Sequence, residues 1–166
     1  ETVKTTLLYR LTDDEWEEEI REDLENLQLI GIEIESVTSD GGNNIIKAVK
    51  KACPNAIRQR CLAHIQRECL TWITKHPQSE AGRELRKIVC MICLIKTHND
   101  KLQWISDLKN WSEKYKDYLN EKTFKEESHR EWYTHKMVRR AYVHIKKALP
   151  DMFHFLDNPR VSKTTK

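Results

Sequence analysis

The chain has 166 residues, of which 33% are charged, and a formal net charge of +3. A chain of this length forms one domain, or a core with a subdomain, and can bury about two thirds of its surface. The longest apolar run, Ile88 to Ile95, has eight residues; a membrane span needs roughly 20, and no basic-then-apolar leader opens the chain, so we expect neither a membrane protein nor a secreted one.

The first elements predict a strand followed by a helix. Val3 to Leu11 is rich in β-forming residues. Thr12 and Glu15 match a capping box, so a helix is expected from there to Gly31. Its apolar residues fall on one stripe that can lie on a sheet, and its acids are expected to face water. The stripe consists of Trp16, Ile20, Leu24 and Leu27.

A second strand is predicted from Ile32 to Ser39, closed by Asp40-Gly41-Gly42. A helix with lysines on one side follows, and then a third strand over Ala56 to Arg60. Strand–helix–strand units of this kind form crossovers with parallel strands. The predicted fold class is therefore α/β, with about three strands that are at least partly parallel. Asp40 then lies at the carboxyl edge of a strand, where open α/β sheets hold their chemistry, although Asp before Gly is also a common turn former.

Beyond His64 the pattern predicts helices. These are expected over Ile65 to Thr74, over Glu80 to Ile95 with Ser79 as cap, and after a cap at Asn99 or Asp100. In the third of them an aromatic face is expected to be core and not a base-stacking platform. That face consists of Trp104, Leu108, Trp111, Tyr115 and Leu119.

The last third of the chain is less regular. Thr123 to Arg130 is polar and predicts a loop or a frayed helix, whereas Glu131 to Leu149 has a two-sided helical pattern. Asp157-Asn158-Pro159 predicts a turn into a polar tail.

The order of these elements, together with one sequence motif, resembles that of a known protein family. Asp40-Gly41 ends a strand, a helix and a strand follow, and Gln59 to Arg67 reads Gln-Arg-Cys-x-x-His-x-x-Arg. This pattern resembles the central part of DDE transposases of the mutator-like superfamily, which includes bacterial insertion sequences. The resemblance implies a partial RNase H-like catalytic core over residues 1–74, an all-helical insertion over 75–150, and a tail over 151–166.

For the site, the resemblance implies that Asp40 is the second of three metal-binding acids and a catalytic residue. The complete enzyme would use Mg²⁺ or Mn²⁺ to cut and rejoin DNA at transposon ends, as a homo-oligomer. Cys61 and His64 would have a structural or strand-orienting role near the active centre. The alternative is that Cys61 is simply buried and His64 hydrogen-bonds a loop.

In the family the first Asp precedes, and the third Glu follows, the segment that matches residues 1–166. With one acid of three, we expect no strand transfer by this polypeptide alone.

Charge divides the chain into an acidic start and a basic remainder. Residues 1–35 carry a balance of −9 and residues 36–166 one of +12, so a polyanion would be attracted to the second part. The last helix has Lys136, Arg139 and Arg140 on one side, which is a candidate phosphate-contacting surface or an ordinary wet face. By analogy with the family, Trp132 is a candidate for base stacking. We expect the protein to be cytoplasmic and associated with the nucleoid. The alternative to a transposase fragment is a non-catalytic DNA- or protein-binding domain derived from a transposase.

Five cysteines without a secretory context indicate reduced thiols. Cys90 and Cys93 lie in an apolar run, where free cysteines pack as small hydrophobic side chains. Together with Cys61 and His64 they offer the ligand types of a zinc site, so a small zinc-stabilised module is a third hypothesis.

Overall fold

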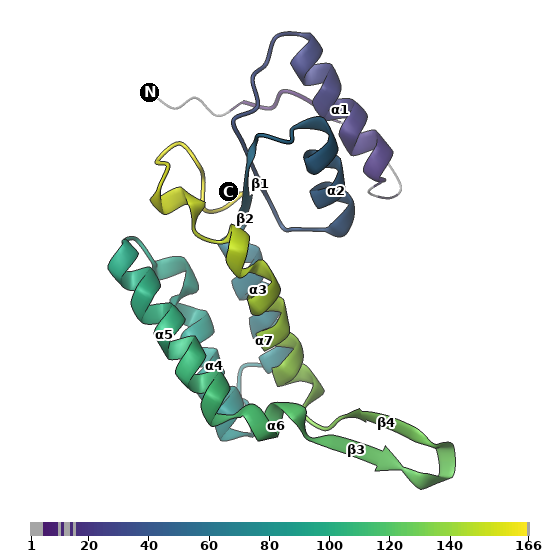
Figure 1. The fold of residues 1–166 in the computed structure, drawn as a ribbon, viewed down its shortest axis with the longest axis vertical. Coiled ribbons are helices and arrows are strands. Elements are labelled where there is room, and N and C mark those ends of the chain that lie inside the picture. The colour runs from purple at the N-terminus through teal and green to yellow at the C-terminus, as the bar shows by residue number, and fades with distance from the viewer. Residues whose placement is uncertain (1–4, 10, 12–13, 15, 166) are drawn as a thin grey trace.

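The computed structural model describes residues 5–9, 11, 14 and 16–165 (Figure 1). The helices are α1 (Glu17–Leu29), α2 (Asn43–Ala52), α3 (Leu62–Ile73), α4 (Glu80–Met91), α5 (His98–Lys114), α6 (Lys116–Asn120) and α7 (Lys136–Ala148). The strands are β1 (Ser36–Ser39), β2 (Ile57–Arg60), β3 (Lys122–Lys125) and β4 (Arg130–Tyr133). Short 3-10 turns follow α4, β3 and α7, the last two turns being Leu149–Asp151 and His154–Leu156.

Strands β1 and β2 form a parallel pair, with Ser36 opposite Ile57 and Ser39 opposite Arg60. Helix α2 makes the crossover between them, so the predicted α/β unit is confirmed. The predicted strand over Val3 to Leu11 is wrong for its described part, because residues 5–9 and 11 form no strand. Val3, Lys4 and Arg10 lie outside the described residues. The described sheet therefore has two strands and not three.

Helix α1 packs against α2. The predicted apolar stripe is not covered by a sheet, because no residue of α1 is buried and Trp16 is 57% exposed. Glu17 also departs from its predicted wet position, since it forms ion pairs with Lys47 and Lys51 of α2. The predicted caps Thr12 and Glu15 lie outside the described residues.

Gly31 ends α1 as predicted. Its φ of +87° is one that glycine adopts without strain. Its N–H donates to the Gln28 carbonyl at 2.9 Å, and the Ile32 N–H donates to the Leu27 carbonyl at 3.0 Å. These are the two bonds of a Schellman motif.

The main hydrophobic core lies among α3, α4, α5 and α7, which we call the helical body. The aromatic face of α5 is part of it, as predicted. Trp104 and Trp111 are buried, and their indole N–H groups donate to the Ile88 and Ala81 carbonyls at 2.8 and 3.0 Å. Hydrogen-bonding the indole N–H removes the cost of burying it.

The caps of the helical body are partly as predicted. The Gly82 N–H donates to Ser79 Oγ at 3.1 Å, so the Ser79 cap of α4 is confirmed. Helix α5 is capped by Thr97, and Asp100 completes a capping box as its third residue. The predicted cap at Asn99 or Asp100 is therefore wrong.

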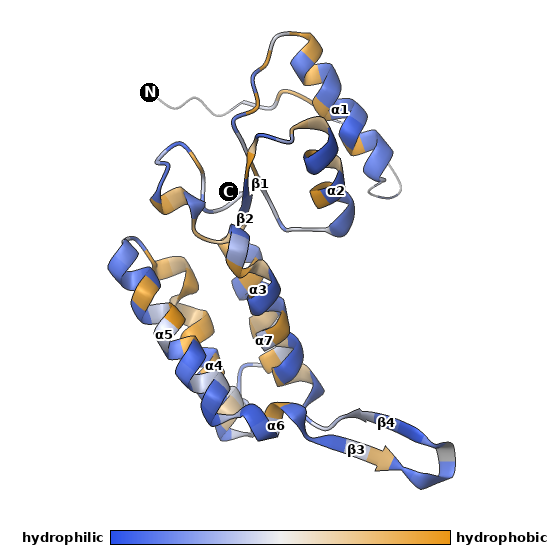
Figure 2. Ribbon diagram, viewed as in Figure 1, coloured by the Kyte–Doolittle hydropathy of each residue, from blue (hydrophilic) through white to orange (hydrophobic). Residues whose placement is uncertain are grey.

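The predicted all-helical insertion is wrong, because β3 and β4 form an antiparallel hairpin. The hairpin projects from the end of the helical body (Figure 1), and Figure 2 shows it as mostly hydrophilic. Thr123 lies opposite Trp132, and these β-forming residues favour paired strands over a frayed helix. Helix α7 consequently begins at Lys136 and not at Glu131. The division of the chain at residues 74 and 150 stays a prediction.

The tail returns to the parallel strands. The predicted turn is confirmed, since the Val161 N–H donates to the Asn158 carbonyl at 3.0 Å. Thr38 Oγ1 then donates to the Ser162 carbonyl at 2.8 Å, and the Leu62 N–H donates to the Lys163 carbonyl at 2.9 Å. Within the described part of the chain, no helix has the length and apolarity to cross a membrane.

Candidate functional site at the carboxyl edge of the parallel strands

Asp40 follows β1 directly, at the carboxyl edge of the parallel pair. Its Oδ1 accepts the Gly42 N–H at 2.9 Å, and α2 begins at the next residue. Asp40 is therefore both a turn former and a strand-edge carboxylate, so the two interpretations of the sequence do not exclude each other. The bond to Gly42 fixes the orientation of the carboxylate, which is half-buried.

Gly41 allows the Arg60 side chain to approach the backbone beside Asp40. Its φ is +82°, and a Cβ added there would lie 2.1 Å from Arg60 Cζ. The Arg60 Nε is buried and has no hydrogen-bond partner among the described residues. Sequence reasoning assigned no role to Arg60, although the double glycine was a sign of a close approach. A guanidinium group is thus held next to the Asp40 turn.

Cys61 follows β2 directly and lies at the same edge. Its N–H donates to the Ser39 carbonyl at 2.7 Å. The thiol lies 3.2 Å from His64 Nδ1 and 3.5 Å from Thr165 Oγ1, and it accepts the Thr165 N–H at 3.4 Å. The structure therefore brings the Asp-Gly turn, the Cys-x-x-His turn and the tail together.

The Cys61 thiol is also unusually acidic. Burial raises the pKa of this thiol, but the hydrogen bonds from Thr165 and His64 outweigh burial and lower the pKa to about 7. A pKa near 7 gives a large thiolate fraction at neutral pH. The side chain itself is only 1% exposed, so the thiolate is placed to hold neighbouring groups and not to react with solvent molecules.

Gln59 is a buried residue of this edge to which sequence reasoning assigned no role. It is 1% exposed, and its Nε2 donates to the Arg60 and Met152 carbonyls, at 2.7 Å each. Its Oε1 accepts the Phe155 N–H at 3.2 Å. Gln59 therefore joins β2 to the segment that follows α7, and its place before Arg60 and Cys61 in the signature was the available signal.

The described residues do not form a complete metal site. No group of three or more His, Cys, Asp or Glu side chains in the described ranges is arranged to hold a metal ion. Asp40 offers a hard oxygen ligand of the kind that Mg²⁺ prefers, while Cys61 and His64 offer sulfur and nitrogen, which Mg²⁺ does not prefer, and they are paired with each other. The zinc hypothesis finds no support either, because Cys90 and Cys93 do not join Cys61 and His64 in such a group.

The four predicted DNA-binding residues lie on two elements. Trp132 lies in β4, whereas Lys136 is the first residue of α7. The Arg139 guanidinium lies over the Tyr133 ring at 3.8 Å, and Arg140 lies over the Trp72 ring at 4.4 Å. Each arginine thus contacts an aromatic ring, and the phosphate-contacting role of Lys136, Arg139 and Arg140 stays a prediction.

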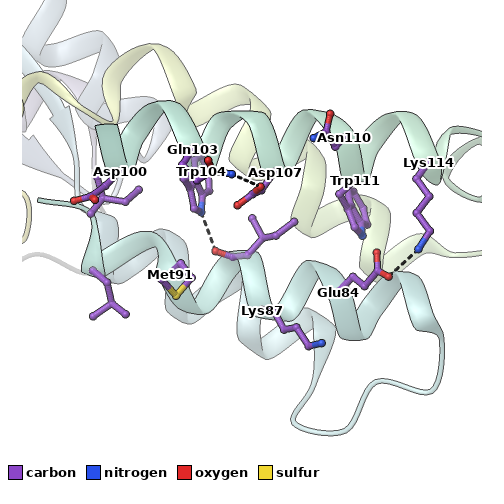
Figure 3. A pocket seen from close by; sticks show the side chains of 13 residues that line it. Glu84, Lys87, Met91, Asp100, Gln103, Trp104, Asp107, Asn110, Trp111 and Lys114 are labelled. Carbon is purple, nitrogen blue, oxygen red and sulfur yellow. Dashed lines mark hydrogen bonds and ion pairs between the residues drawn. The ribbon is translucent and has the colours of Figure 1, made fainter. Parts of the chain in front are cut away.

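A groove of about 550 Å³ lies between α4 and α5, away from the strand edge (Figure 3). Its apolar lining includes Met91, Trp104 and Trp111. Several of its polar groups bond to each other: Lys114 Nζ donates to Glu84 Oε1 at 2.8 Å. Such a lining suits an apolar partner and not phosphate chemistry.

Comparison with known proteins gives one match. No curated protein and no solved structure matches the chain. The family described as "Transposase, Mutator family" matches residues 1–165, which span the Asp-Gly turn, the Cys-x-x-His turn, the hairpin and the tail. The chain therefore belongs to the mutator family of transposases.

Proposed function

We propose that this chain supplies the Asp40 carboxylate to the divalent-metal site of a DDE transposase that cuts and rejoins DNA at transposon ends. The observation that supports this proposal is the position of Asp40 at the carboxyl edge of a parallel strand pair. The strand–helix–strand unit around it agrees with an RNase H-like core. Family membership supports DNA as the substrate.

The proposed chemistry is phosphoryl transfer by in-line attack. Divalent ions, Mg²⁺ or Mn²⁺, would activate the attacking oxygen and stabilise the leaving one. The part played by this chain is to orient Asp40 through the Gly42 N–H and to place the Arg60 guanidinium beside the same turn, where it can attract a phosphate. Since the described residues contain no group that could complete the site, we expect this polypeptide alone not to cut DNA.

Replacing Asp40 tests the proposal. In a transposase that contains this segment together with its other acids, Asp40→Asn should abolish magnesium-dependent nicking of DNA and leave the thermal unfolding temperature unchanged. Asp117→Asn, an exposed acid on α6, is the matched control and should nick normally. Unchanged nicking by the Asp40→Asn protein would show that Asp40 is not part of the active site.

We further propose that Lys136, Arg139 and Arg140 contribute to binding duplex DNA. Replacing all three by Gln should weaken duplex binding and lower the slope of log K against log salt by about 0.9 for each phosphate that the variant no longer binds. An unaltered slope would assign these residues to ordinary surface. Because Arg139 and Arg140 each contact an aromatic ring, the single replacement of Lys136 is expected to have the largest effect of the three.

The α4–α5 groove favours a second candidate function, a non-catalytic domain that binds a protein. Its apolar residues Met91 and Leu94 are 51% and 58% exposed, which is typical of a surface that binds another protein. A chain that fails to bind DNA even at low salt, but whose binding to a protein partner is abolished by Met91→Glu, would favour this function over the first.

A further inference from the structure

A second groove, of about 460 Å³, lies between α3 and α4 and shares no lining residue with the α4–α5 groove. Five of its residues belong to α3, and their spacing of i, i+3, i+4, i+7 and i+8 places them on one face of that helix. They are Ala63, Gln66, Arg67, Leu70 and Thr71. Lys75 and Arg86 complete the lining of this α3–α4 groove.

The α3–α4 groove begins at the strand edge that carries Asp40. Helix α3 starts directly after Cys61, so Ala63 lies in its first turn, and Lys75 lies two residues beyond its end. The 12 residues of α3 span about 18 Å at 1.5 Å per residue. The groove therefore leads away from the candidate site along the side of the helical body.

The charged lining residues of the groove are all cations, namely Arg67, Lys75 and Arg86. Arg67 and Lys75 are exposed, and neither forms an ion pair within the described part of the chain. Glu68 follows Arg67 but is directed to α7, where its Oε2 lies 2.9 Å from His144 Nε2. The groove thus presents positive charge that no acid of its own lining balances.

Hydrogen bonds fix the two walls of the groove. Gln66 Nε2 donates to the Val89 and Cys90 carbonyls of α4, at 3.0 and 2.9 Å. At the other end, Arg86 Nη1 donates to the Thr74 carbonyl at 2.9 Å. Since these bonds join α3 to α4 before any ligand binds, little freedom of the helices is lost on binding.

We propose that the α3–α4 groove binds the phosphate backbone of one strand of duplex DNA, with phosphates held by Arg67, Lys75 and Arg86. The inference rests on the proposed function in taking DNA as the ligand. Among the lining residues there is no aromatic ring on which a base could stack, and the Gln66 amide is already bonded to α4. Contacts to the backbone position a protein on DNA without reading its sequence.

The place of the groove defines which part of the DNA it would hold. Duplex DNA rises about 3.4 Å per base pair, so the length of α3 corresponds to about five base pairs. The groove would bind the duplex beside the phosphate that is presented to Asp40, and it would do so for any sequence.

The test measures binding of the intact chain to a labelled duplex over a range of salt concentrations. Replacing Arg67 and Lys75 together by Gln should lower the slope of log K against log salt by about 1.8, because each phosphate contact contributes about 0.9. The difference in affinity from the wild type should then grow about 60-fold for each tenfold dilution of salt. Arg86 is left in place, because its bond to Thr74 joins the two helices.

Two controls separate the groove from the total charge of the chain. Lys109→Gln combined with Lys116→Gln removes the same charge from exposed positions of α5 and α6, outside the groove, and should change the slope by less than about 0.4. Arg67→Lys alone keeps the charge and should retain the wild-type slope, because lysine also binds phosphate. Far-UV circular dichroism checks that each variant is folded.

The outcomes separate the inference from the proposed function. An unchanged slope in the variant of Arg67 and Lys75, or an equal change in the control of Lys109 and Lys116, overturns the inference while the role of Asp40 stands. If the groove variant binds DNA normally but no longer binds a polyglutamate peptide that the wild type binds, the groove serves an acidic protein and the inference is overturned. Failure of the wild type to bind duplex DNA even at low salt overturns the proposed function as well.

Discussion

The helical body and the strand edge are stabilised in different ways. In the helical body Leu85, Ile92 and Ile145 are each 0% exposed, so burial of apolar surface holds its helices together. At the strand edge β1 and β2 have four residues each, and α1 contributes no buried residue. This end is attached to the body by directional bonds through Gln59 and the tail. The part of the molecule that presents Asp40 thus depends on few, specific interactions.

Removing a core side chain of the helical body should have the largest effect. Leu85→Ala is expected to lower the free energy of unfolding by about 3 kcal/mol, because it leaves a cavity in a closed core. Leu29→Ala is the matched control in α1, where Leu29 is 83% exposed; it should cost less than about 0.5 kcal/mol. Urea denaturation measures both, and equal losses would show that α1 is as well packed as the body.

Gln59 tests the attachment between the two regions. Gln59→Leu keeps the volume but leaves the Met152 carbonyl and the Phe155 N–H without their partner, so we expect a loss of about 2 kcal/mol. Gln78→Leu, at an exposed glutamine, is the control. Hydrogen exchange should accelerate at Phe155 in the first variant only. Protection of that amide in Gln59→Leu would mean that other contacts hold the segment.

The acidity of Cys61 makes the strand edge sensitive to pH. Its pKa is about 7 in the folded chain, below the ordinary value of 9.0. The folded state therefore binds fewer protons than the unfolded state between these values, and the stabilisation is complete above pH 9 and lost as pH falls to 7.

In unfolding experiments the difference between the wild type and Cys61→Ser should grow by about 1 to 2 kcal/mol from pH 7 to pH 9. A constant difference would contradict the hydrogen bonds from His64 and Thr165. Cys69→Ala provides a control of opposite sign, because burial raises the Cys69 pKa to about 12 and its contribution is lost as pH rises.

The smallest expected effect is the cost of displacing the Arg60 side chain, which a comparison of two glycine variants can isolate. Gly31 and Gly41 have similar positive φ values, of 87° and 82°, so an alanine at either costs about 1 kcal/mol through the backbone. A Cβ meets nothing within 4 Å at Gly31 but meets the Arg60 guanidinium at Gly41. The additional loss in Gly41→Ala over Gly31→Ala measures the displacement of Arg60. No additional loss would show that Arg60 moves aside freely.

Local signals predicted the elements around Asp40. The strand, the Asp-Gly turn, α2 and β2 follow from branched residues, glycines and a helical period, and each lies within a short window of the chain. The tail contacts could not be predicted in this way, because Thr38 and Ser162 are distant in the sequence. Gln59 and Met152 are also distant in the sequence, so their hydrogen bond could not be predicted from local signals either.

The hairpin was missed because its local signals are weak. Its strands are short and charged, and its turn has no glycine: His129 adopts the left-handed conformation, with φ of 48°. The predicted last helix also began at Glu131, which placed Glu131 and Trp132 on a helix. At the start of the chain the error was the opposite one, because a strand was predicted where none forms. The β-forming residues from Thr5 to Tyr9 pair with no strand among the described residues.

Helix α7 sets a distance between the two ends of the molecule. It leads from the hairpin to the segment held by Gln59 beside β2 (Figure 1), and its 13 residues span about 20 Å at 1.5 Å per residue. Duplex DNA rises about 3.4 Å per base pair, so this length equals about six base pairs. Helix α7 therefore keeps the hairpin and the segment held by Gln59 about 20 Å apart.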